Sequence, residues 1–475
     1  MIILSSRQTR AFSSFAVVFF LSIYVWSITA LPIWVDESWT LKISGMNFLE
    51  IISFCLQEAD VVHLTYYLIC HTLTSVIHSS LILLRFLSLV STIFTCVLLF
   101  KLAKNYFGLT AARITTLIYA LFPSTFDYAT QARSTALVSL LMTIILVKVL
   151  EVHRWGEIKP ITLSLLSIAT LSLNVLTIVL LGPLILYLLI SKYGTLLSKF
   201  SRLVVSFPLF FVSPLIIWAH GQRAQVTWIA ESYSIGDGFK RIFLWPLIES
   251  ERNLNGLKLA IFIALILILI LNAKPKLKVN GIKENFLPLI ALYSFAPSTI
   301  LWVISFFSPI QQTRYIAYSG VGIALLFGTH LSKCKINFLR GFTSISLVIV
   351  CLIHYSHIIS THGESFDWSN RKVHIFAENG ESLLVASPSW YAPMFEYYIQ
   401  KRLRVFQLQD IKKISLSEVL SCDSNSHNIL IISPNRDMKV ESSDIHFLTS
   451  IGYSVDQQYR SESNSVIRMR PNACL

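Results

Sequence analysis

The sequence predicts a polytopic α-helical membrane protein that ends in a small α/β domain. Hydrophobic residues make up 54% of the chain and charged residues only 14%, whereas ordinary soluble chains carry roughly 25% charged residues. Several windows of roughly 16–22 residues contain almost no charge, and segments of that length span a bilayer or nearly do so. After about residue 358 the composition turns polar, and short apolar runs alternate with helical patterns.

We expect about 11 membrane spans, near residues 11–31, 81–100, 112–126, 134–150, 160–173, 175–190, 203–219, 257–271, 286–307, 315–331 and 338–358. The first apolar run is longer than a signal-peptide core and no A-x-A site follows it, so we interpret it as an uncleaved span. A long first external loop covers residues 32–80. Its apolar second half is expected to lie along the membrane surface or to dip into it, because a further span would invert all later topology.

The distribution of charge predicts the orientation of the spans. When the loops are sorted alternately from the N-terminus, Lys and Arg concentrate on one side and Asp and Glu on the other. The positive-inside rule then places the N-terminus in the cytoplasm and the C-terminal domain outside. The net charge of +13 therefore reflects topology and a basic tail, and it does not indicate a nucleic-acid-binding protein.

The chain divides into a transmembrane domain over residues 1–358 and an extracytoplasmic α/β domain over residues 359–475. In the tail, SLLVAS (382–387), RVFQLQ (404–409) and NILIIS (428–433) are predicted strands, and APMFEYYIQK and SLSEVLS are predicted helices between them. The tail contains neither a G-x-G-x-x-G sequence nor a Walker loop, so no nucleotide site is expected. The seven Cys residues form no C-x-x-C pair, and pairing of Cys422 with Cys474 stays open.

A specific set of polar and ionisable residues collects on the predicted external face. Such residues are costly at membrane depth and commonly functional. The set comprises Asp36 and Glu37 between Trp34 and Trp39, then Asp60, His63, Tyr66 and Tyr67, then Asp127, Gln131 and Arg133, and finally Arg314 and Tyr315.

This mixture of residue types suits sugar transfer from a lipid phosphate. A hydroxyl acceptor needs a general base within hydrogen-bond reach, and a departing phosphate needs fixed positive charge. The guanidinium fork of Arg binds phosphate oxygens bidentately, and Arg133 and Arg314 are both expected at headgroup level. More ordinary interpretations compete with this one, because an Arg at a span end also snorkels to headgroups and Trp and Tyr form interfacial belts.

Five blocks carry a resemblance to a known family: WVDESWTL, DVVHLTYYLICH, FDYATQARSTAL, RAQVTWI and PIQQTRY, in this order. Over most of residues 11–358 the chain resembles the GT-C superfamily of polyprenyl-phosphate-sugar glycosyltransferases. It looks most like the bacterial, actinobacterial-type branch of the dolichyl-phosphate-mannose protein mannosyltransferase family. The resemblance implies an inverting hexosyltransferase of the bacterial cell membrane with a polyprenyl-phosphate sugar donor. Mannose is the expected sugar, and a protein, a glycolipid or a cell-wall polysaccharide is the acceptor.

The resemblance also implies a role for each candidate residue. The catalytic base corresponds to Asp36 and its companion to Glu37. Residues expected at the donor phosphate are Arg133, Arg314 and Tyr315, and residues expected at the substrate are Asp60, His63, Tyr66, Tyr67, Asp127 and Gln131. The chain departs from the family pattern at Leu64 and Thr65, where relatives often have prolines, and at Thr135, where many have Tyr.

No cofactor is required by this interpretation and no metal site is assigned. Some GT-C enzymes use a divalent cation, and Asp60 with His63 would form half of a ligand set, so metal dependence stays open. Two other functional classes also stay open. A transporter or flippase for a lipid-linked glycan would favour ionisable residues in mid-span, whereas those here gather at span ends. A non-catalytic cell-envelope scaffold would tolerate replacement of Asp36, Arg133 and Arg314.

Overall fold

The computed structural model describes residues 21–31, 33–57, 60–77, 81–155, 159–191, 198–221, 286–307 and 313–334, a few positions between 349 and 356, and the strands of the C-terminal part. The chain forms two compact units. One comprises Met1–Thr29 and Ile43–Ser356, and the other comprises Ala30–Lys42 and His357–Leu475. Each unit is described by itself below.

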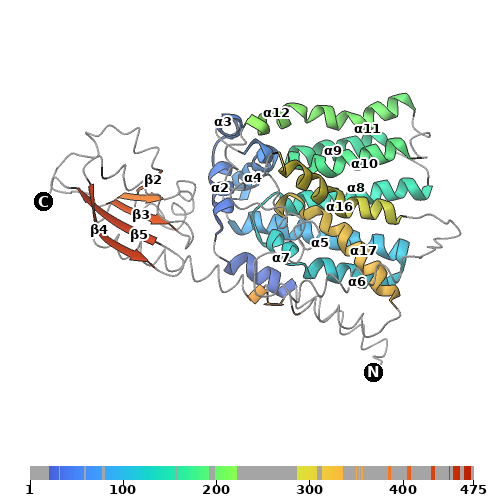
Figure 1. The fold of residues 1–475 in the computed structure, drawn as a ribbon, viewed down its shortest axis with the longest axis horizontal. Helices are drawn as coiled ribbons and strands as arrows, with labels where there is room; N and C mark the ends of the chain where they lie inside the picture. Colours follow the sequence, from blue (N-terminus) through green and yellow to red (C-terminus); the bar gives the residue numbers. More distant parts are fainter. Residues whose placement is uncertain are drawn as a thin grey trace, which may run out of the picture. The chain divides into compact units, whose positions relative to one another are not determined.

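The larger unit is helical (Figure 1). Residues 21–30 are helical, and the short helices of the predicted first loop are α2 (Val35–Ser44), whose beginning belongs to the other unit, α3 (Phe48–Gln57), η1 (Val61–His63) and α4 (Leu64–Ile77). The following elements are α5 (Leu81–Phe107), α6 (Leu109–Leu121), α7 (Pro123–Thr130), α8 (Thr135–Trp155), α9 (Pro160–Leu173), η2 (Val175–Thr177), α10 (Ile178–Ile190), α11 (Lys199–Phe211), α12 (Ser213–Gly221), α16 (Leu287–Ser305), η6 (Thr313–Tyr315), η7 (Ala317–Ser319) and α17 (Gly320–Lys333).

Four helical segments among the described residues are long and apolar enough to cross a membrane: Leu81–Phe107, Thr135–Val152, Lys199–Ala219 and Pro288–Ser305. At 1.5 Å per residue, α5 alone measures about 40 Å, which exceeds the hydrocarbon core of a bilayer. The predicted spans 112–126, 160–173 and 175–190, and the described end of the span 11–31, correspond to shorter apolar helices. In the predicted span 315–331, 3-10 turns precede the helix α17, which begins only at Gly320. Residues 11–20 of the first predicted span, residues 222–256 of the fourth external loop, the predicted span 257–271 and most of the span 338–358 lie outside the described residues. The number of about 11 spans therefore stays a prediction.

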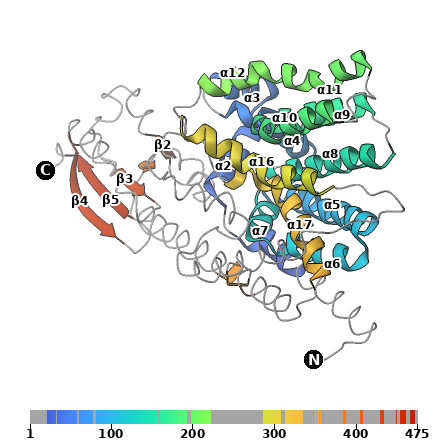
Figure 2. The same cartoon turned by 45° about the vertical axis from the view of Figure 1, so that its right-hand side comes forward.

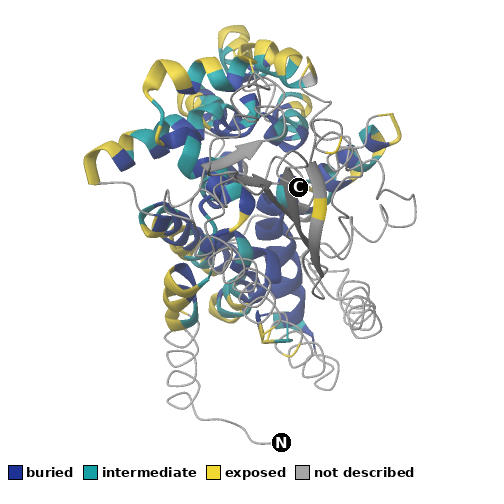
Figure 3. Ribbon diagram, turned by 90° about the vertical axis from the view of Figure 1, so that its left-hand side faces the viewer, coloured by how far each residue is buried: buried dark blue, intermediate teal, exposed yellow. Residues whose placement is uncertain are grey.

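Small residues allow the central helices to approach closely. Helix α6 packs against both α5 and α17, and α16 also packs against α17 (Figures 1 and 2). A Cβ atom built at Gly328 would lie 2.2 Å from Oγ1 of Thr115, and one at Gly322 would lie 2.7 Å from Oγ of Ser294. Close packing over small residues is the usual basis of helix association in membranes. Helix α17 is accordingly buried from Gly320 to Leu331, whereas other helices carry exposed positions beside buried ones (Figure 3).

Two predicted spans are interrupted in the structure. The predicted end of the span 112–126 was wrong: the helix α6 stops at Leu121, and Pro123 begins a separate helix, α7. Proline is favoured in the first turn of a helix, where its missing N–H costs nothing. The predicted span 203–219 is divided between α11 and α12 at Val212. The first of these breaks places a short, buried helix directly before the segment that carries Arg133.

The described residues of the C-terminal part form a five-stranded sheet of order β2-β1-β3-β5-β4. Strands β1 (Leu383–Ala386), β2 (Arg404–Gln407) and β3 (Ile429–Ser433) are parallel and coincide with the three predicted strands. Strands β4 (Tyr453–Arg460) and β5 (Ser465–Pro471) pair antiparallel and were not predicted. Parallel neighbours require long crossover connections. The helices predicted in those connections, and Cys422 and Cys474, lie outside the described residues.

Candidate active site

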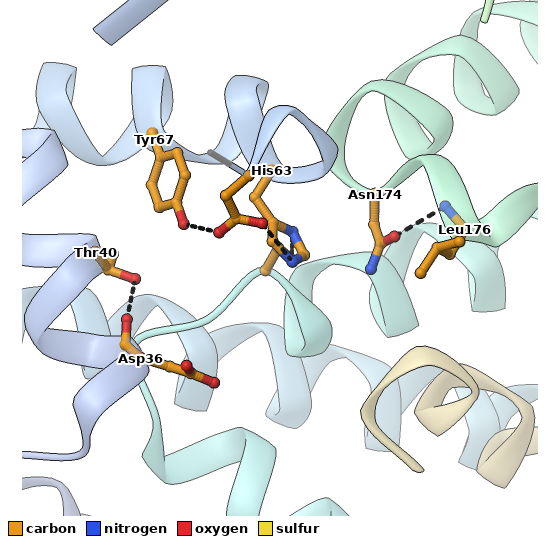
Figure 4. Close-up of polar contacts among 8 residues, drawn as sticks. Asp36, Thr40, His63, Tyr67, Asn174 and Leu176 are labelled. Carbon is orange, nitrogen blue, oxygen red and sulfur yellow. Dashed lines mark hydrogen bonds and ion pairs between the residues drawn. The ribbon is translucent and has the colours of Figure 1, made fainter. Parts of the chain in front are cut away.

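The two adjacent acids of the first loop have different environments. Both lie in the first turn of α2, where the helix dipole favours negative charge. Glu37 is fully buried, and its Oε2 accepts a 2.9 Å hydrogen bond from the backbone N–H of Trp34. A Glu that reaches back from the third helical position to the N-cap amide forms half of a capping box. Asp36 is only partly buried, and its carbonyl accepts a 3.0 Å bond from Thr40 (Figure 4).

Asp60 has the only positive φ angle of a non-glycine residue within the part of the chain that the structure describes. Its φ of 67° and ψ of 34° are left-handed, a conformation that Asp tolerates better than most residues. Its carboxylate accepts a hydrogen bond from the hydroxyl of Tyr67, and its Oδ1 lies 3.9 Å from Nε2 of His63 (Figure 4). Strained residues of this kind persist where surrounding contacts hold them, as at functional sites.

His63 links Asp60 to the segment that follows α7. Its ring is buried, and its Nδ1 lies 3.0 Å from the hydroxyl of Ser134, which immediately precedes α8. Burial lowers the pKa of His63, and although the Asp60 carboxylate opposes this effect, Arg133 and Arg314 lower the pKa further. His63 is therefore a neutral imidazole at neutral pH, and it acts as a hydrogen-bonding group rather than as a cation.

Two arginines that are far apart in the sequence converge on His63. Arg133 lies in the break between α7 and α8, and Arg314 lies in η6, yet the positive charge of each is close enough to lower the pKa of His63. The guanidinium of Arg314 also lies 5.3 Å from the ring centre of Tyr315. We call Asp60, His63, Tyr67, Arg133 and Arg314 the His63 cluster. It comprises one carboxylate and two guanidinium groups whose charges act on a neutral ring.

The remaining candidates differ in burial and in the unit to which they belong. Tyr66 is 1% exposed, and its ring centre lies 6.3 Å from that of Tyr67, so its ring packs inside the fold and is closed off from solvent. Asp127 lies in α7, and Gln131 begins the break that carries Arg133; both are partly buried. Asp36 and Glu37 belong to the unit that contains Ala30–Lys42.

No group of three or more His, Cys, Asp or Glu side chains that could hold a metal ion occurs among the residues that the structure describes. Asp60 and His63 are adjacent, as the sequence suggested, but they supply two ligands at most. Their mutual arrangement is that of an acceptor facing a ring nitrogen, which suits positioning as well as ligation.

Sequence reasoning overlooked two polar residues beside the cluster. Ser134 contacts His63 directly. Asn174 is buried between α9 and η2, its Oδ1 accepts a 3.0 Å bond from the backbone N–H of Leu176, and the η2 segment packs against η1 (Figure 4). The signal for Asn174 was available in the sequence, since a single Asn between two apolar runs is an unusual polar group at membrane depth.

The chain is similar to known glycosyltransferases over a part of its sequence and to solved structures over nearly its whole length. Residues 64–218 match the family of dolichyl-phosphate-mannose-protein mannosyltransferases. Among curated proteins, no sequence matches. The crystal structure of ArnT from Cupriavidus metallidurans bound to undecaprenyl phosphate is similar with a TM-score of 0.51 and 12% identity, over 96% of this chain and 98% of that chain. The same protein in the apo state gives a TM-score of 0.52 and 11% identity, with the same coverage.

The family match and the structural similarity cover different parts of the chain. The family match begins after Asp36, Asp60 and His63 and ends before Arg314, so it includes only the part of the His63 cluster that contains Tyr67 and Arg133. The similarity to ArnT extends over nearly the whole chain, and at this level of identity it establishes a shared fold.

Proposed function

We propose that this chain, a membrane glycosyltransferase of the GT-C type, transfers a sugar from a polyprenyl-phosphate donor to a hydroxyl group of an acceptor on the external face of a bacterial cell membrane. Mannose is the expected sugar, and the transfer inverts the configuration at the anomeric carbon. The N-terminus is cytoplasmic and the C-terminal α/β domain is extracytoplasmic in this proposal. The acceptor is a protein, a glycolipid or a cell-wall polysaccharide.

The observation that carries the proposal is the convergence of Arg133 and Arg314 on His63. The positive charges of both residues act on the buried ring of His63 and lower its pKa, although one residue comes from η6 and the other from the break before α8. Paired guanidinium groups are suited to a phosphate because each presents several N–H donors in a planar fork. The solved structure of ArnT, which shares the fold, was obtained with undecaprenyl phosphate bound, and this supports a polyprenyl phosphate as the carrier.

In the proposed reaction, Asp36 removes the proton from the acceptor hydroxyl as its oxygen attacks the anomeric carbon. The bond between that carbon and the phosphate oxygen breaks, and the electron pair leaves with the polyprenyl phosphate. Arg133 and Arg314 stabilise the additional negative charge that develops on the phosphate. Attack from the face opposite the leaving group inverts the configuration. Glu37 holds the beginning of α2, on which Asp36 lies.

Transfer from a labelled polyprenyl-phosphate mannose tests the proposal directly. Full-length protein in membranes, with an extract of cell-envelope acceptors, is expected to yield a labelled product, and Asp36→Asn is expected to lower the rate at least about 100-fold by removing the general base. Glu50→Gln is a matched control, because Glu50 is also an acid in the first turn of a loop helix and it caps α3 through Asn47. Undiminished transfer by Asp36→Asn at normal expression would refute the base assignment.

Donors with other sugars test the identity of the sugar separately from the enzyme class. Transfer from a polyprenyl-phosphate pentose in place of the mannose donor would correct the sugar and leave the enzyme class intact. Movement of a lipid-linked glycan across the membrane of proteoliposomes, without any modification of an acceptor, would show that the protein is a transporter and would overturn the proposal.

A further inference from the structure

The backbone around Arg133 has little support from secondary structure. Helix α7 ends at Thr130 and α8 begins at Thr135, so residues 131–134 belong to neither. Gln131 is extended, with φ of −107° and ψ of 145°, and the N–H of Arg133 donates a 2.9 Å bond to the carbonyl of Gln131. Because no helical ladder orients this segment, the position of the Arg133 backbone depends on contacts that fix the neighbouring residues.

Two side chains from other parts of the fold, Ser88 and His63, contact this segment on the C-terminal side of Arg133. The hydroxyl of Ser88 in α5 donates a 3.4 Å bond to the carbonyl of Arg133. The hydroxyl of Ser134 lies 3.0 Å from Nδ1 of His63, across 71 residues of sequence. Ala132 and Ser134 are fully buried whereas Arg133 is partly exposed. The arginine therefore emerges from a segment that is buried on both sides of it and anchored on its C-terminal side.

The direction of the bond between Ser134 and His63 follows from the other ring nitrogen. Nε2 of His63 faces Oδ1 of Asp60 at 3.9 Å, and a carboxylate attracts the proton of a neutral imidazole to the nitrogen nearest to it. In the tautomer with the proton on Nε2, Nδ1 carries the lone pair, so the hydroxyl of Ser134 donates and His63 accepts. Asp60 is itself oriented by the hydroxyl of Tyr67. A chain of side-chain contacts thus runs from Tyr67 through Asp60 and His63 to the residue next to Arg133.

We propose that His63 and Ser134 are positioning residues that hold Arg133 in the direction required by the phosphate of the donor. This inference rests on the proposed function, because it takes Arg133 as a phosphate-binding residue. It differs from the expectation drawn from the family resemblance, in which His63 itself contacts the substrate. Ser134 has a role here that neither the resemblance nor the family match assigns.

Kinetics of Ser134→Ala in purified full-length protein test the proposal. The loss of one buried hydrogen bond at the segment is expected to lower kcat/KM for the donor about tenfold, while KM for the acceptor stays within about twofold. Binding of undecaprenyl phosphate, which needs no transfer, should weaken by a similar factor. Ser134→Thr keeps the hydroxyl and should restore most of both. Ser91→Ala is the matched control, since Ser91 is a buried serine of α5 that donates only to the carbonyl of Leu87.

Variants of His63 keep the test valid if Ser134→Thr is too large for its site. His63→Asn places an amide oxygen near the position of Nδ1 and can still accept from Ser134, whereas His63→Leu cannot. Donor binding should follow that order, with His63→Leu weaker than His63→Asn. Equal binding by the two variants, at equal unfolding temperatures, would overturn the proposal.

A double-mutant cycle distinguishes this inference from the proposed function. If Ser134 acts through Arg133, Ser134→Ala should change donor binding by less than about twofold once Arg133→Gln is present. Additive effects of the two substitutions on donor binding would overturn the inference. Wild-type donor binding by Ser134→Ala, together with a large loss of binding by Arg133→Gln, would also overturn it. In contrast, unchanged binding of undecaprenyl phosphate by Arg133→Gln would overturn the phosphate assignment of the proposed function.

Discussion

The backbone N–H of Trp34 donates a 2.9 Å hydrogen bond to Oε2 of Glu37, and this contact separates the roles of two neighbouring carboxylates. Glu37 is fully buried and closes the N-terminus of α2, whereas Asp36 is partly buried on the same first turn. Of these two adjacent acids, Glu37 caps the helix and Asp36 stays partly exposed.

Substitutions at Glu37 should therefore act through helix capping. Glu37→Gln retains an amide oxygen that can accept from Trp34, and it should lower transfer by no more than about tenfold. Glu37→Ala leaves the amide unsatisfied and should cost about 1 kcal/mol of stability or more. Thermal unfolding in detergent together with the transfer rate measures both effects. Loss of transfer by Glu37→Gln as severe as that by Asp36→Asn, with unchanged stability, would contradict this division of roles.

Tyr67→Phe should destabilise the protein more than Tyr24→Phe. The hydroxyl of Tyr67 donates to the Asp60 carboxylate, whereas that of Tyr24 donates a 2.8 Å bond to the neutral carbonyl of Ala120. Bonds to charged groups contribute about 1.5–3 kcal/mol and neutral ones about 1 kcal/mol. Because Asp60 is 35% exposed, we expect about 1.5 kcal/mol for Tyr67→Phe. Unfolding temperatures of the two variants, compared under identical conditions, decide the order.

The stability of the protein should fall in acid through His63. Burial lowers the pKa of His63 from its usual 6.5, and Arg133 and Arg314 act in the same direction against Asp60. The unfolded chain then binds this proton at a higher pH than the folded chain does. The stabilisation is fully present above the unfolded-state pKa and is lost as the pH falls through the lowered folded-state value. Unfolding temperatures between pH 8 and pH 5 should therefore fall less in His63→Asn than in the wild type or in Ser91→Ala.

Gly328→Ala should disrupt the contact between α17 and α6. The added Cβ would lie 2.2 Å from Oγ1 and 2.6 Å from Cα of Thr115, so backbone must move, at an expected cost of about 1–3 kcal/mol. Gly182→Ala in α10 is the control, because apart from its two chain neighbours nothing lies within 4 Å of the added atom. Since Pro183 follows and its ring crowds the preceding residue, this change should alter the stability by less than about 1 kcal/mol in either direction. Equal unfolding temperatures of the two variants would show that the central helices separate more easily than their packing implies.

Local patterns determined much of what was predicted correctly. The nearly uncharged run from residue 81 forms the helix α5, and the run at 160–173 forms α9 within the predicted bounds. The short apolar runs of the tail form β1, β2 and β3. For the helices, the length and hydrophobicity of one contiguous segment are sufficient, because backbone hydrogen bonds in lipid must be satisfied within the segment itself. For the strands, a short apolar run bounded by polar residues is sufficient to mark the segment, although not its partners.

The His63 cluster shows what such patterns could not determine. Asp60, His63, Arg133 and Arg314 were all chosen from the sequence as residues of one external face, but their mutual roles were not. The left-handed backbone at Asp60, the contact of His63 with Ser134, and the convergence of Arg314 on His63 depend on segments far apart in the chain. Their energies arise from burial and from pairwise geometry, which no single segment encodes.

The sequence by itself therefore determined that the chain is a multi-helical membrane protein with acids and arginines suited to transfer from a lipid phosphate. Only the tertiary structure decided that Glu37 caps α2, that His63 is buried and neutral, and that Ser134 stands between His63 and Arg133. The reason is physical: periodic burial is a local property of a helix or strand, whereas the role of a polar side chain depends on the partner that folding brings within hydrogen-bond distance.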